Sequence, residues 1–70
     1  MEQNKLKTLK RYLELINVAN AAFDRAAREE NPSRRADYMC CGRVILTAVD
    51  WADFAQLSIE FEQEDAKCAA

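Results

Sequence analysis

The apolar residues between positions 6 and 27 recur at alternating intervals of three and four, and this pattern constrains the fold more than any other feature. The series, which we call the seam, runs through Leu6, Leu9, Leu13, Ile16, Asn20, Phe23 and Ala27. Such spacing places side chains along one side of an α-helix, as between packed helices. It predicts a helix over about residues 4–30.

A single proline divides the helical pattern. Asn31 precedes Pro32, and a residue before proline avoids the helical region of backbone conformation. Pro32 suits the first turn of a second helix, with Asn31 or Ser33 as its N-cap. Only Gly42 interrupts the sequence beyond this point. We therefore predict a turn at about 30–33 and a second helix over about 32–66.

The length and the scarcity of turn residues predict one all-α domain over residues 1–70. The chain has 70 residues, with one Gly and one Pro, too few for the many turns of a β fold. A connection this short folds the two helices back on each other as an antiparallel hairpin. That register brings Phe23 near Cys40 and Cys41.

The second segment carries more apolar surface than one partner helix can cover. One stripe contains Tyr38, Cys41, Ile45, Ala48, Ala52, Ala55 and Ile59, and a second contains Cys40, Val44, Thr47, Trp51, Phe54, Ser58 and Phe61. The simplest cover for the second stripe is another copy of the chain. We therefore predict that two hairpins dimerise into a four-helix bundle. Its core or dimer contacts are assigned to Leu13, Ile16, Asn20, Phe23, Ile45, Trp51 and Phe54.

Asn20 is the polar member of the seam. A buried polar residue at such a position costs stability but can fix the register or the oligomeric state. The alternative is that Asn20 lies at the edge of the seam and meets water.

Composition argues against a metal, a cofactor and a membrane. There is no His, and the three Cys include the adjacent pair Cys40 and Cys41, which is not a zinc-ligand spacing. We expect this pair to be buried as small apolar side chains, and Cys68 to lie in a frayed tail. No apolar run approaches the ~20 residues of a membrane span. No signal-peptide pattern is present, so we expect a cytoplasmic protein with free thiols.

Three carboxylates on the second segment, Asp50, Asp53 and Glu60, could in principle serve as acid and base or hold a divalent metal. Neither a histidine partner nor a Gly-rich phosphate loop accompanies them. We interpret them as a solvated face, and expect no enzymatic activity and no small-molecule substrate.

Charge is distributed unevenly along the chain. Residues 1–35 carry eight basic and five acidic side chains, and residues 36–70 carry two basic and seven acidic ones, within a net charge of −2. The two halves therefore attract each other weakly, and neither is basic enough to require nucleic acid. A nucleic-acid alternative, an RNA-binding hairpin dimer, rests on Lys5, Lys7, Lys10 and Arg11 beside Tyr12.

The turn region carries residue types that are enriched in protein interfaces. They are Tyr38, Arg34, Arg35, Met39 and Arg28. One interpretation makes Tyr38 a structural side chain that closes the end of the bundle. The other makes Tyr38 the anchor of a partner-binding surface, surrounded by the three arginines and Met39.

Four segments carry a resemblance to a known family: Phe23-Asp24-Arg25-Ala26-Ala27, Asn31-Pro32-Ser33, Asp37-Tyr38-Met39 and Val49-Asp50-Trp51-Ala52. With the hairpin layout, they make the chain resemble the small helical anti-activator (anti-quorum-sensing) proteins of Mu-like phages that infect Pseudomonas. The resemblance covers nearly the whole chain. It implies a dimeric hairpin that binds host proteins and disables them. The implied targets are a LuxR-type quorum-sensing activator and the type IV pilus assembly ATPase, with Tyr38 at the contact.

The sequence thus predicts a non-enzymatic, homodimeric inhibitor of a host regulatory protein. It would act by occupying the regulator's DNA-binding or dimerisation surface, with no chemical step.

Overall fold

The computed structural model of the chain describes the backbone of residues 1–69 and the side chains of residues 1–67. It contains three helices: α1 (Gln3–Arg28), α2 (Pro32–Thr47) and α3 (Trp51–Ala69). The predicted all-helical class is confirmed. The predicted division into two helices is wrong, because the segment assigned to one helix over 32–66 forms two.

The turn between α1 and α2 forms where the sequence predicts it. Oδ1 of Asn31 accepts hydrogen bonds from the backbone N–H of Ser33 at 2.9 Å and of Arg34 at 3.2 Å, and Pro32 occupies the first turn of α2. The guanidinium of Arg35 donates to the carbonyl oxygen of Glu29 through Nε at 3.0 Å and Nη2 at 2.8 Å. These contacts satisfy backbone groups that the helix ends leave without partners.

The break between α2 and α3 needs neither Gly nor Pro. The N–H groups of Ala48 and Val49 bond to carbonyls three residues back, which tightens the last turn of α2. Oδ1 of Asp50 then accepts a hydrogen bond from the backbone N–H of Asp53 at 3.1 Å. An aspartate in this position is a strong N-cap, so it starts a new helix and turns the chain away from the axis of α2.

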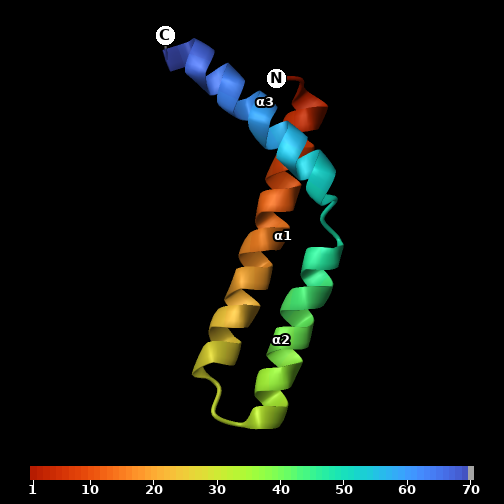
Figure 1. Ribbon diagram of the computed structural model, residues 1–70, viewed down its shortest axis with the longest axis vertical. Coiled ribbons are helices and arrows are strands. Elements are labelled where there is room, and N and C mark those ends of the chain that lie inside the picture. The colour runs from red at the N-terminus through yellow and green to blue at the C-terminus, as the bar shows by residue number, and fades with distance from the viewer. Residues whose placement is uncertain (70) are drawn as a thin grey trace.

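Helices α1 and α2 run antiparallel side by side, and α3 crosses the N-terminal half of α1 (Figure 1). The resulting shape is long and thin, with extents of 50 × 22 × 16 Å. The N-terminus lies against α3, with its ammonium 2.9 Å from Oε1 of Glu64.

The contact between α1 and α2 is close because small residues face each other. Ala19 and Ala26 of α1 are buried, and so is Gly42 of α2. The ring of Phe23 lies over Gly42 so closely that a Cβ added there would come within 2.5–2.9 Å of three ring carbons. The sequence predicts Phe23 near Cys40 and Cys41, and the residue that its ring covers is the next one, Gly42.

The core is thin. Besides the two alanines, the buried apolar side chains are Leu9 of α1, Val49 of the α2–α3 connection and Leu57 of α3. No large side chain among the described residues is completely buried. So few buried side chains contribute little hydrophobic stabilisation, as expected at this length.

The fit between Phe23 and Gly42 can be tested by a double-mutant cycle. Gly42→Ala alone should lower the free energy of unfolding, because the new methyl group displaces the Phe23 ring. In a Phe23→Leu background, where the two nearest ring atoms are absent, the same change should instead stabilise by up to about 1 kcal/mol, the gain in helix propensity. Urea unfolding of the four proteins measures the cycle. Equal effects of Gly42→Ala in both backgrounds would contradict the close contact.

Candidate functional site

The seam of α1 divides into two sets that differ in burial. Leu9 is buried and Ile16 and Phe23 are half-buried. The other set, spaced by seven residues, consists of Leu6, Leu13, Asn20 and Ala27, of which only Leu6 is half-buried and the rest are exposed. We call this second set the outer seam. It leaves apolar side chains at helical spacing on an open side of α1.

An apolar groove of about 300 Å³ lies at one end of the outer seam, where α3 crosses α1. Its walls are formed by Leu6, Leu9 and Leu13 from α1 and by Ser58 and Phe61 from α3, with Lys10 and Glu62 at the rim. Leu13 is 44% exposed and Phe61 46% exposed. We call it the α1/α3 groove. The sequence does not reveal it, because it exists only when the chain breaks at Asp50.

Polar contacts hold α3 on α1 next to this groove. The hydroxyl of Tyr12 donates a hydrogen bond to Oδ2 of Asp53 at 2.9 Å, and the Tyr12 ring meets the Phe54 ring edge to face at 6.2 Å. Lys5 Nζ lies 3.2 Å from a carboxylate oxygen of Glu60. Asp53 and Glu60 are therefore half-buried and paired with α1. They keep part of their surface in solvent, but they lie at the edge of the α1/α3 contact and not on a fully solvated face.

These contacts shift two pKa values. The Asp53 carboxylate accepts a hydrogen bond from the protonated Tyr12 hydroxyl and, as a nearby negative charge, opposes its ionisation, so the pKa of Tyr12 lies above its ordinary value of 10.0. The N-terminal ammonium, 2.9 Å from Oε1 of Glu64, lowers the pKa of that carboxyl group. Both pairs are at the surface, where solvent weakens them.

The predicted partner-binding residues do not form a single patch. Tyr38 and Met39 are both half-buried, and by helical geometry they lie on opposite sides of Gly42, which faces α1. Met39 lines a shallow hollow of about 280 Å³ with Arg35, Phe23, Ala26 and Ala27. Tyr38 does not line that hollow. Arg28 and Arg34 are exposed.

None of the residues predicted to form the core or the dimer contacts is fully buried in the isolated chain. Ile16, Phe23, Ile45 and Phe54 are half-buried, whereas Leu13, Asn20 and Trp51 are exposed. For these three residues a role in a dimer stays a prediction. The buried positions outside the predicted core are Leu9, Ala19, Ala26, Gly42, Val49 and Leu57. The seven-residue spacing of Ala19 and Ala26 was the available signal for a close helix contact.

The cysteine prediction is corrected as well. Cys40 and Cys41 are exposed free thiols, not buried apolar side chains. Cys68 lies outside the residues whose side chains are described. Among the described residues, no group of three or more metal-ligating side chains comes together.

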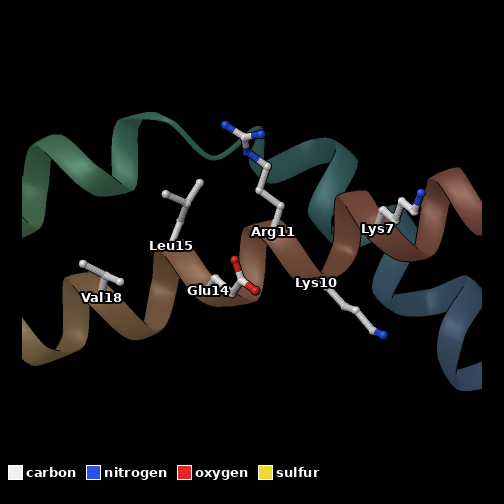
Figure 2. Close-up of a pocket in the computed structure, with 6 residues that line it drawn as sticks. All are labelled: Lys7, Lys10, Arg11, Glu14, Leu15 and Val18. Atoms are coloured by element: carbon white, nitrogen blue, oxygen red, sulfur yellow. The ribbon is translucent and has the colours of Figure 1, made fainter.

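The second surface feature is a shallow hollow along α1 itself, of about 580 Å³. It is lined by Lys7, Lys10, Arg11, Glu14, Leu15 and Val18 (Figure 2). We call it the basic hollow. It contains three of the four basic residues on which the nucleic-acid alternative rests, and the fourth, Lys5, is paired with Glu60.

Comparison with protein-family models, with curated proteins and with solved structures finds no match for this chain. Over the residues described, none of the helices combines the length and the apolar character needed to span a membrane.

The Tyr12–Asp53 hydrogen bond can be checked by titration. In a Tyr38→Phe variant Tyr12 is the one remaining tyrosine, so tyrosinate absorbance reports its ionisation alone. The midpoint should lie above 10.0 and should fall towards 10.0 on Asp53→Ala. Because the pKa is raised in the folded state, the stabilisation is complete below pH 10 and is lost as the pH rises through the folded pKa. A midpoint at 10.0 with Asp53 present would refute the bond.

Proposed function

We propose that the chain is a non-enzymatic interaction protein that acts as a homodimer and blocks a host regulatory protein. The observation that carries the proposal is the apolar surface left open on the outer seam and in the α1/α3 groove. In this dimer the α1 and α2 helices of two copies form a four-helix bundle, with α3 of each copy packed across its own α1.

The amount of exposed surface supports a second copy. A compact monomer of 8.0 kDa would expose roughly 4,500 Å², whereas the chain exposes 5450 Å². Its radius of gyration is 15.7 Å, against about 11 Å for a compact chain of this length. The excess area is close to the ~800 Å² per partner that a stable interface of standard size buries.

The position of the open apolar residues supports the same face for the contact. Leu6 and Leu13 belong both to the outer seam and to the α1/α3 groove, so the apolar strip continues from α1 onto Phe61 of α3. A two-fold axis through this strip would bring identical apolar surfaces together, as an isologous interface requires. Asn20 would then lie within the interface, where a polar residue fixes register.

The dimer predicts a specific response to charge on the outer seam. Leu13→Asp should convert the protein from twice the 8.0 kDa chain mass to the single-chain mass, because an unpaired carboxylate in the interface loses its hydration. Sedimentation equilibrium measures the mass. Val18→Asp is the matched control, because Val18 is 55% exposed and lies about 140° from Leu13 around α1. A monomeric wild-type chain, or an unchanged mass for Leu13→Asp, would contradict the dimer.

The blocking function follows from the resemblance to phage anti-activator proteins. Its mechanism is steric: the bound dimer occupies the regulator's DNA-binding or dimerisation surface, and inhibition follows affinity. The proposed targets are the LuxR-type activator and the type IV pilus assembly ATPase. Tyr38 is the proposed anchor. It is the seventh residue of α2, between one and two turns from the start of the helix, and keeps part of its surface exposed, as a contact residue requires. The exposed Arg28 and Arg34 lie at the same end of the molecule.

The anchor role can be tested with purified targets. Tyr38→Ala should weaken binding to a LuxR-type activator or to the pilus ATPase by at least ~2 kcal/mol, the cost typical of a hot-spot residue. Tyr38→Phe keeps the ring and should retain most of the affinity. Isothermal titration measures binding, and circular dichroism checks that both variants stay helical. Unchanged binding of Tyr38→Ala would remove Tyr38 from the interface, and no binding by the wild type would exclude these targets.

A further inference from the structure

The basic hollow on α1 combines charge with an apolar floor. Leu15 and Val18 are three residues apart and so are neighbours on the helix surface; Val18 is 55% exposed. Lys10 and Arg11 project to opposite sides of α1 (Figure 2), and Lys7 lies further towards the N-terminus. The two apolar side chains therefore lie at the end of the hollow furthest from the N-terminus, and the basic side chains lie along its two edges.

The charges of the hollow are available for an external partner. Among the described residues, the ion pairs involve the N-terminal ammonium and Lys5, not Lys7, Lys10 or Arg11. Three cations face one carboxylate, that of Glu14. The surface therefore carries a net positive charge, and it attracts acidic groups.

The composition of the hollow favours a protein over a nucleic acid. Nucleic-acid surfaces pair cations with aromatic rings on which bases stack. The nearby aromatic residue, Tyr12, is half-buried, with its hydroxyl bonded to Asp53 and its ring against Phe54. Val18 and Leu15 offer aliphatic contact instead, and the Glu14 carboxylate repels a continuous phosphate backbone.

We propose that the basic hollow binds an acidic amphipathic helix of a partner protein. Apolar side chains of that helix would pack on Leu15 and Val18, and its Asp and Glu side chains would pair with Lys7, Lys10 and Arg11. The hollow spans positions 7–18 of α1, about 16 Å or three helical turns. This length suits a partner helix that makes contact through its residues i, i+4 and i+7. The inference rests on the proposed function as a protein-binding protein and names the partner class.

The basic hollow and the outer seam can be used at the same time. Val18 and Leu13 are five residues apart, which places them about 140° apart around the helix. Lys10 borders both surfaces, and a second copy bound at the outer seam leaves Lys7, Arg11, Leu15 and Val18 of the basic hollow open. Each dimer would present two such hollows.

The test uses the 70-residue chain and three synthetic probes. They are an acidic amphipathic peptide of about three to four turns, a peptide with the same apolar pattern but lysine in place of glutamate, and a single-stranded RNA of similar length. Fluorescence anisotropy measures binding, and backbone amide NMR shifts locate it. We expect the acidic peptide to bind, the lysine peptide not to bind, and the shifts to centre on Arg11, Leu15 and Val18.

Variants then separate the hollow from general charge attraction. A Lys7→Glu, Arg11→Glu double variant should weaken binding of the acidic peptide by about tenfold. Val18→Asp should also weaken binding, because it removes one of the two apolar side chains on which the peptide packs. The matched control is Arg43→Glu, an exposed arginine on α2, which should leave affinity within about twofold.

Three outcomes would overturn the proposal: no binding of the acidic peptide, equal loss with Arg43→Glu, or tighter binding of RNA that depends on Lys7 and Arg11. Sedimentation of the same samples keeps the two proposals apart. If the protein is a dimer but does not bind the acidic peptide, only the proposal for the basic hollow is refuted. A monomer that binds the peptide refutes the dimer and supports the hollow.

Discussion

The N-cap at Asp50 is the interaction on which the rest of the structure depends. Its side chain bonds to the backbone N–H of Asp53 and so starts α3 in a new direction. An uninterrupted second helix would extend along α1 and could cover the seam over its full length. With the break, α3 crosses α1 instead, and the seam is covered on one side only. The open groove is therefore a consequence of one capping aspartate.

The crossing of α3 is stabilised differently from the α1–α2 contact. Between α1 and α2, small residues allow the backbones to approach, and the Phe23 ring fills the space above Gly42. Between α1 and α3, one buried leucine from each helix is joined by polar contacts at the surface. Such surface contacts contribute little individually. The position of α3, and the width of the groove beside it, should therefore respond more to pH and salt than the α1–α2 pair does.

The sequence was sufficient to predict the helical class, the extent of the first helix and the turn at Asn31–Pro32, because each depends on local signals. It was not sufficient to predict the break, since residues 47–50 contain neither Gly nor Pro and Asp50 fits a solvated helix face equally well. The groove was missed for the same reason. The exposure of Leu13 follows from tertiary packing, because periodicity shows that a side of α1 is apolar but not which part another helix covers.

The two surfaces of α1 differ in the physics of recognition. The outer seam is apolar with one polar residue, so its binding energy comes from area removed from water, and it suits an identical surface that is equally apolar. The basic hollow has only two apolar side chains. Its charges orient the partner and raise the rate of association, but they contribute less to affinity. A single hollow is therefore a weak site. Dimerisation through the outer seam would place two such sites on one particle, and a partner that is itself dimeric could engage both, with avidity compensating for the weakness of each contact.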